Sequence, residues 1–370
     1  MKVLILTCNT GQGHNASAAA IQEVFVTNGH ECNIADTISF LSKSASKIVD
    51  TCFTAIYRHI PKAFNLGYTH AEDHIGKLDP AEALLKVMIP GNKRLHRYIT
   101  ENGYTHVICV HIFPAIMLTM LRKRVSLDAS ISFLTTDYTL YPLMDKVDID
   151  QYLLPHADLA PAFEQSGIPA ERLFATGMPV RKAFFEEQSR TESRRKLGLS
   201  DSDTIILMMG GSMGCGPIEE LVNSLADAVD EHTKILISCG TNAKLLRNLE
   251  KNTSGKVFAF RYAENIPDIM AASDLFITKP GGISITESSI LGLPTLLLNF
   301  VGGCETHNFN FFTEHQYAVG AQNVEDAVKK CCDLLASPDI LAWHSARTRA
   351  AFDRNPAVEI YRVVSGEYTN

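Results

Sequence analysis

The stretch "SDLFITKPGGISITESSILGLPTLLLNF", residues 273–300, decides the fold of this chain. An apolar run at 274–279 ends in a Pro-Gly-Gly turn, a helical stretch follows, and a second apolar run covers 294–300. Short runs rich in Ile, Leu and Val around a helix predict parallel strands that are covered on both faces. Folds of this kind bind ligands at the carboxyl ends of their strands, where the glycine turn lies.

The same alternation of strands and helices extends along the rest of the chain. The candidate strands are residues 2–7, 31–36, 106–111, 131–136, 149–154 and 172–177, and then 204–211, 234–240, 256–260, 274–279 and 294–300. Two such sets predict an α/β chain with two Rossmann-like doubly wound domains. We expect a first domain at 1–180, a second at 200–355 and a C-terminal helix at 356–370. The sequence leaves open whether this helix returns to the first domain.

Composition excludes several classes of protein. The net charge of −7 argues against a general nucleic-acid binder. The nine cysteines include no C-x-x-C spacing, so neither a zinc site nor a redox motif is indicated, and a reducing cytosol is the expected compartment. No apolar stretch approaches the roughly 20 residues that span a bilayer.

The turn after residues 274–279 has the chemistry of an anion site. Gly281 and Gly282 let the backbone turn, and the N–H groups near Ser284 start a helix that would attract negative charge. Glu287, one turn further on, fits a pair of hydroxyls such as those of a ribose, or else caps the helix. Polar residues Glu305 and Asn308 follow the next strand and suit sugar hydroxyls.

Two further glycine loops follow strands. The loop within 207–227 has four glycines in seven residues, which favours a phosphate cradle over a plain turn. The loop within 6–21 contains Gly11, Gly13 and His14. It lacks the third glycine of a dinucleotide-binding fingerprint, so an anion site and a plain turn with a solvent-facing histidine are both open.

These loops together resemble one glycosyltransferase family. The letters GQGHNASAAA at 11–20 and TKPGGISITE at 278–287 are similar to motifs of the family that contains monogalactosyldiacylglycerol synthase and the bacterial processive diacylglycerol glucosyltransferases. The stretches GMPVR at 177–181 and LMMGGSMGCGPIEE at 207–220 extend the similarity over most of the chain. A more distant similarity is to the N-acetylglucosaminyltransferase that makes lipid II.

The resemblance implies a GT-B fold, in which two Rossmann-like domains face a cleft. It implies that the second domain holds a UDP-hexose, that the first presents a lipid acceptor such as diacylglycerol, and that the transfer inverts the anomeric centre without a metal or another cofactor. The donor-binding residues that it implies are Gly211, Ser212, Arg261, Tyr262, Ile266, Gly281, Gly282, Ser284, Glu287, Glu305 and Asn308.

The same resemblance places His14 at the acceptor hydroxyl, with Gly11 and Gly13 in the acceptor-side wall. A histidine titrates near neutrality and can therefore accept the proton of that hydroxyl. Asp137 is an alternative base, in which case His14 would act through its charge. His111 is a third candidate at the same sheet edge, or else a structural cap.

Two departures from the family leave the substrates open. Cys304 stands where the family has a glutamine that contacts the hexose, and a thiol is a poor hydrogen-bonding group. The stretch after Asp137 also lacks the His and Trp of the plant enzymes, which leaves the acceptor open. The sequence Asp148-Ile-Asp150 matches the metal-binding D-x-D of another glycosyltransferase fold, but we interpret it as the solvated start of a strand.

Residues 41–100 combine basic and apolar side chains. Nine Lys or Arg and five acidic residues give this segment a positive charge within an acidic chain. Such a surface fits an anionic membrane, although a helix pair that covers the sheet is equally compatible. We therefore expect a cytoplasmic enzyme that is peripheral on the inner face of the plasma membrane. The alternatives are a UDP-sugar 2-epimerase and a non-catalytic UDP-sugar sensor.

Overall fold

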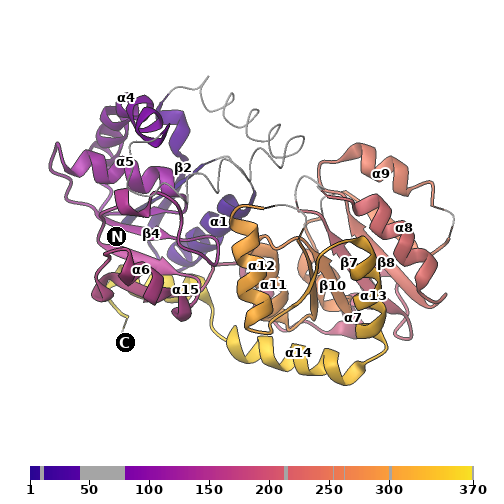
Figure 1. Ribbon diagram of the computed structural model, residues 1–370. Coiled ribbons are helices and arrows are strands. Elements are labelled where there is room, and N and C mark those ends of the chain that lie inside the picture. The colour runs from indigo at the N-terminus through magenta and orange to yellow at the C-terminus, as the bar shows by residue number, and fades with distance from the viewer. Residues whose placement is uncertain are drawn as a thin grey trace. The chain divides into compact units, whose positions relative to one another are not determined.

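The computed structural model describes residues 1–8, 12–41, 80–211, 216–252, 254–261, 263–299 and 302–368. The chain forms two compact units, residues 1–181 together with 354–370, and residues 182–353. Each unit is built on a parallel six-stranded sheet with helices packed against it (Figure 1). The predicted α/β class with two doubly wound sheets is confirmed.

The first sheet has the strand order β2-β1-β3-β4-β5-β6. Its strands are β1 (Lys2–Thr7), β2 (Glu31–Asp36), β3 (His106–Cys109), β4 (Ser130–Leu134), β5 (Gln151–Leu154) and β6 (Leu173–Ala175). Its helices are α1 (Gln12–Thr27), α4 (Pro80–Glu101), α5 (Ile112–Arg122), α6 (Ala160–Gln165) and α15 (Pro356–Ser365). Because β1, β3 and β4 are neighbours, the residues that follow them meet at one edge of the sheet.

The C-terminal helix α15 is part of the first unit (Figure 1). Its side chains Ile360 and Val363 share a buried cluster with Ile5 of β1 and with Ile21 and Phe25 of α1. Apolar burial of this kind contributes about 1.5–3 kcal/mol for each large side chain. The last helix of the chain therefore completes the core under the first strand.

The second sheet has the order β12-β11-β10-β7-β8-β9. Its strands are β7 (Thr204–Met209), β8 (Thr233–Ser238), β9 (Val257–Phe260), β10 (Leu275–Thr278), β11 (Thr295–Leu298) and β12 (Val319–Ala321). Its helices are α7 (Arg190–Leu197), α8 (Ile218–Ala228), α9 (Ala243–Leu249), α10 (Ile266–Ala272), α11 (Gly282–Leu291), α12 (Cys304–Glu314), α13 (Val324–Leu335) and α14 (Pro338–Ala351). The adjacent strands β7, β10 and β11 bring the two glycine loops of this unit to one edge.

The two aspartates of the D-x-D sequence lie before β5, and both pair with arginines. Asp150 lies 2.7 Å from the Arg122 guanidinium and accepts a hydrogen bond from the Ile131 N–H, and Asp148 lies 2.9 Å from Arg172. Burial by itself raises the pKa of Asp150, but the hydrogen bonds from Arg122 and the Ile131 N–H and the charges of both arginines together outweigh it and hold the pKa below its usual range. The two carboxylates thus tie the start of the strand to its neighbours.

Most of the segment predicted to contact a membrane, residues 42–79, lies outside the described residues, and its end forms part of α4. Among the helices that are described, none combines the length and the apolar character needed to cross a membrane.

Arg194 on α7 stabilises the second unit through buried hydrogen bonds and an ion pair. Its side chain is 1% exposed, and it donates hydrogen bonds to the carbonyl oxygens of Ala272, Asp201 and Asp203 and pairs with Asp274. We expect Arg194→Met to lower the free energy of unfolding by about 3 kcal/mol, because the buried acceptors lose their donor. Chemical denaturation measures the change.

The matched control is Arg195→Ala, which removes a guanidinium that is 77% exposed from the same helix. Equal denaturation midpoints for the two variants would contradict the structural role of Arg194.

Candidate functional site

His14 lies in the first turn of α1, directly after β1, and residues that follow β3 and β4 surround it. Its Nδ1 atom is 2.8 Å from the Val110 carbonyl oxygen and 3.0 Å from Thr136 Oγ1. A carbonyl oxygen can only accept a hydrogen bond, so Nδ1 carries the proton. The neutral ring therefore keeps its lone pair on Nε2, for which the described residues offer no partner. The fold fixes the tautomer in which Nε2 can act as a base.

A chain of hydrogen bonds joins His14 to Asp137. Thr136 Oγ1 lies 3.0 Å from the Tyr141 hydroxyl, and that hydroxyl donates to Asp137 Oδ2 at 2.7 Å. The Thr136 N–H donates to the same Tyr141 oxygen at 3.2 Å. Polarised chains of this kind strengthen each bond within them. A positive charge on His14 is thus linked through two hydroxyls to a carboxylate.

Burial lowers the pKa of His14 below its ordinary value, while the Asp137 charge and the Val110 hydrogen bond act in the opposite direction. The effect of burial is the largest, because the imidazolium loses more free energy of hydration than the neighbouring groups restore by charge and hydrogen bonding. His14 is therefore neutral at pH values near and above its ordinary pKa of about 6.5. This is the protonation state that accepting a proton requires.

His111 has a structural role in the same cluster. It forms the N-cap of α5, where its Nδ1 accepts a hydrogen bond from the Phe113 N–H at 3.1 Å. Its ring lies 4.8 Å from that of His14, edge to face. Burial and the neighbouring His14 hold the pKa of His111 well below its ordinary value. The capping role that the sequence left open for His111 is thus present. This role does not decide whether His111 also takes part in catalysis.

A second cluster lies at the edge of the other sheet, in the second unit. Lys279 directly follows β10 and forms an ion pair with Glu305 in the first turn of α12. The two side chains are only 18% and 9% exposed. Lys279 also lies over Gly211, since a Cβ atom there would be 2.3 Å from the Lys279 Cε. One cation thus connects the glycine loop after β7, the turn after β10 and the loop after β11.

Helix α11 begins beside this ion pair. Its N-cap is Gly281, which supplies no side-chain cap, so the N–H groups of the first turn, from Gly282 to Ser284, face outward from the helix end. Helix α12 likewise begins at Gly303 without a side-chain cap. Uncapped helix ends carry partial positive charge and attract anions. Together with Lys279, whose charge Glu305 balances in this structure, these helix ends place a cation and N–H donors along one edge of the sheet, which we call the positive edge.

The remaining predicted donor residues occupy varied positions. Glu287 is buried on α11, and Asn308 is fully buried on α12, where it donates to the Pro280 carbonyl oxygen at 2.9 Å. Arg261 follows β9 at the same edge and is exposed, whereas the Ile266 side chain is buried. Gly13 lies in α1. The predicted residues Gly11, Ser212 and Tyr262 lie outside the described residues.

Sequence reasoning missed three side chains of these clusters. Lys279 belongs to the motif TKPGG, and its charge beside two glycines was the available signal. Thr136 and Tyr141 flank Asp137 in TTDYTLYP, but their spacing alone has no special chemistry. Their role depends on the approach of His14, which is more than 120 residues earlier in the chain.

Gly211 cannot take a side chain without displacing Lys279. Its φ of +71° is in the left-handed region, and its missing Cβ leaves room for the lysine. The resemblance of the sequence motifs implies a UDP diphosphate at this loop. On that expectation, Gly211→Ala weakens UDP binding about tenfold or more, which corresponds to about 1.4 kcal/mol, as measured by calorimetry. Gly255→Ala is the control, because Gly255 has φ +70° but nothing within 4 Å. Equal affinities of both variants for UDP would contradict this role.

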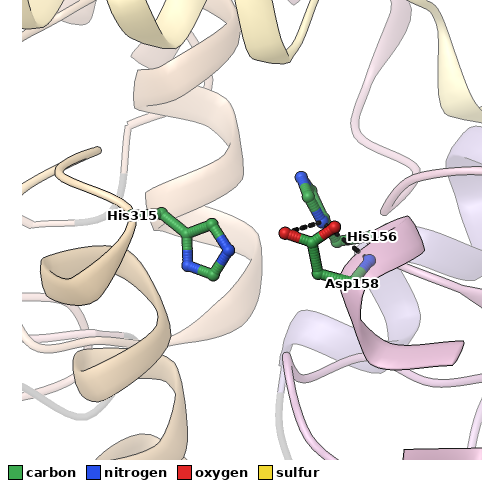
Figure 2. Close-up of side chains that lie close together, drawn as sticks. All are labelled: His156, Asp158 and His315. Carbon is green, nitrogen blue, oxygen red and sulfur yellow. Dashed lines mark hydrogen bonds and ion pairs between the residues drawn. The ribbon is translucent and has the colours of Figure 1, made fainter. Parts of the chain in front are cut away.

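Two histidines that lie outside these clusters have structural roles within their own units. His156 caps the short helix at Ala157–Leu159: its Nδ1 accepts from the Asp158 N–H at 3.2 Å and lies 3.7 Å from the Asp158 carboxylate (Figure 2). His315, also drawn in Figure 2, follows α12 in the second unit. Its Nδ1 donates to the Phe311 carbonyl oxygen at 2.8 Å, and its ring stacks on Phe311.

Two family models match the chain. Residues 14–180 match the model described as monogalactosyldiacylglycerol (MGDG) synthase, and residues 205–334 match the glycosyltransferase family 28 C-terminal domain. A similar curated protein is the processive diacylglycerol beta-glucosyltransferase of Bacillus pumilus (strain SAFR-032). It is 28% identical over 350 residues, which cover 92% of this chain and 88% of the relative.

Solved structures with low sequence identity share the fold. MurG of Acinetobacter baumannii has a TM-score of 0.66 and 14% identity, with 99% of each chain covered. The Anabaena protein HepE in complex with UDP-glucose has a TM-score of 0.60 and 14% identity, with 99% of this chain and 98% of that chain covered. These likenesses confirm the predicted GT-B type of fold, and the family matches confirm the resemblance drawn from the sequence motifs.

Proposed function

We propose that this glycosyltransferase transfers a hexose from a UDP-sugar to diacylglycerol. Its residues 14–180 belong to the MGDG synthase family, and its residues 205–334 form a family 28 C-terminal domain. The observation that carries the proposal is the fixed tautomer of His14, which leaves Nε2 as a base within a domain of the MGDG synthase type. The name of the similar Bacillus enzyme supports the acceptor, and the UDP-glucose complex of HepE supports the donor.

In the proposed reaction, His14 Nε2 accepts the proton of the acceptor hydroxyl as its oxygen attacks the anomeric carbon. The bond from that carbon to the UDP oxygen breaks, and the new glycosidic bond forms on the opposite face, so the configuration inverts. Asp137 stabilises the resulting imidazolium through Tyr141 and Thr136. A base of this kind contributes typically 10²–10⁴-fold to the rate.

The leaving UDP carries the negative charge that develops in this step. We assign its diphosphate to the positive edge of the second sheet, where Lys279 and the first turn of α11 supply charge and N–H donors. Preorganised charges of this kind stabilise a developing anion without a metal ion. Glu305 then exchanges its contact with Lys279 for hydroxyls of the hexose, and Glu287 binds the ribose.

Release of UDP from several UDP-hexoses, with and without diacylglycerol vesicles, tests the proposal. We expect release only when donor and lipid are both present, with a glycosylated lipid as the product. Conversion of a UDP-sugar without lipid would replace the proposal with the epimerase alternative. Tight UDP binding without turnover on any donor would replace it with a sensor.

A further inference from the structure

Helix α14, which lies in the second unit (Figure 1), has large apolar side chains that are exposed to solvent. Ile340 and Trp343 are each 47% exposed, and the spacing of Ile340, Trp343 and Arg347 places them on one face of the helix. The adjoining side of the helix, with His344 and Thr348, is buried. Trp343 is the only tryptophan of the chain.

The side chain of Arg347 is held in a defined position on this face. Its guanidinium carbon lies 5.5 Å from the centre of the Trp343 ring and 5.7 Å from that of Tyr317, and its Nε donates to the His315 carbonyl oxygen at 2.8 Å. Its two terminal nitrogens have no hydrogen-bond partner in the described part of the chain. A fixed fork of N–H donors is suited to two oxygens of a phosphate.

The same face is hollowed beside the guanidinium. A shallow, open depression of about 530 Å³ is lined by Tyr317, Trp343 and Arg347 and by the small residues Ala346, Ala350 and Ala351. The surface therefore places apolar area, an indole N–H and phosphate-binding donors within two helical turns. Its single acidic side chain on α14, Asp339, lies in the first turn, away from the guanidinium.

We propose that this face of α14 docks on a phospholipid membrane, with Ile340 and Trp343 among the upper acyl carbons and Arg347 on a headgroup phosphate. Charge complementarity decides the occupant, because a lipid interface offers phosphate oxygens directly above apolar chains and favours tryptophan there. This face belongs to the second unit, whereas residues 41–100 belong to the first.

The role of this surface in bringing the enzyme to its acceptor rests on the proposed function, but the test of membrane binding does not. Emission from the single tryptophan reports on α14 directly when vesicles of phosphatidylglycerol are added without donor sugar or diacylglycerol. We expect the emission to move to shorter wavelength and brominated lipids to quench it. A transferase that fails to act on diacylglycerol would leave this result unchanged.

Variants then locate the contact. We expect Arg347→Ala to weaken vesicle binding about fivefold, which corresponds to about 1 kcal/mol for one cation at an anionic surface. Ile340→Glu should weaken it at least as much. Arg195→Ala and Phe258→Ala are the matched controls, because they remove an exposed cation and a side chain that is 46% exposed elsewhere in the same unit.

Three results would overturn the proposal. The first is no vesicle binding, or binding that leaves the Trp343 emission unchanged. The second is equal binding by Arg347→Ala and Arg195→Ala, provided that both melt at the wild-type temperature. The third is an emission shift that follows protein concentration without vesicles, which would assign the face to a second copy of the chain.

Discussion

Replacing His14 with alanine is expected to lower kcat/KM by 10²–10⁴-fold, because this side chain is the proposed base. The variant should still fold, because His14 lies at the edge of the sheet. Steady-state rates of UDP release with UDP-glucose and diacylglycerol vesicles measure the loss. Wild-type turnover by this variant would remove His14 from the mechanism.

The dependence of kcat/KM on pH tests the same hypothesis, because the proposed base predicts the direction of the change. His14 must be neutral to accept a proton, and burial lowers its pKa below the ordinary value. We therefore expect kcat/KM to stay constant as the pH falls through 6.5 and to decline only below it, as the lowered pKa is crossed. An acid limb above 6.5 would show that another group controls the rate.

Asp137→Asn separates the two candidate bases. The Asp137 charge raises the pKa of His14, so its loss should move the acid limb of the wild-type profile to still lower pH. If His14 is the base, this variant keeps measurable turnover with that shifted limb. If Asp137 is the base, turnover falls as far as in His14→Ala and the limb disappears.

Replacing Lys279 with alanine is the second change with a large expected effect. We expect kcat/KM to fall about 10²–10³-fold, because the leaving diphosphate loses its nearest proposed cation. Glu305 would also keep a buried charge without this partner, which we expect to lower the free energy of unfolding by about 3 kcal/mol. Kinetics and thermal unfolding measure the two effects separately.

A double variant distinguishes catalysis from stability. Lys279→Ala with Glu305→Gln removes both charges but keeps a hydrogen-bonding side chain for the hexose at position 305. The melting temperature should therefore recover while turnover stays low. Lys244→Ala removes an exposed lysine from the same unit and should leave both quantities unchanged. Recovery of turnover in the double variant would show that Lys279 serves only to neutralise Glu305.

Much of the fold follows from local sequence patterns. The predicted strands from residues 2–7 to 294–300 are all present, although most end a residue or more earlier, as β3 does at Cys109. Strand β12 was not predicted, because Val319–Ala321 is only three residues long and has no apolar periodicity. The glycine loops were also found, since a turn between strand and helix requires small residues.

The sequence by itself determined two parallel sheets, their glycine turns and the family that these motifs indicate. Hydrophobic runs and turn residues act over a few positions, so they can be found without knowing what lies beside them in space. Only the tertiary structure decided which nitrogen of His14 is free and where Lys279 is paired. The Val110 carbonyl is 96 residues from His14, and Glu305 is 26 residues from Lys279. These partners meet because of the order of the strands in each sheet, and that order is what sets the chemistry of both clusters.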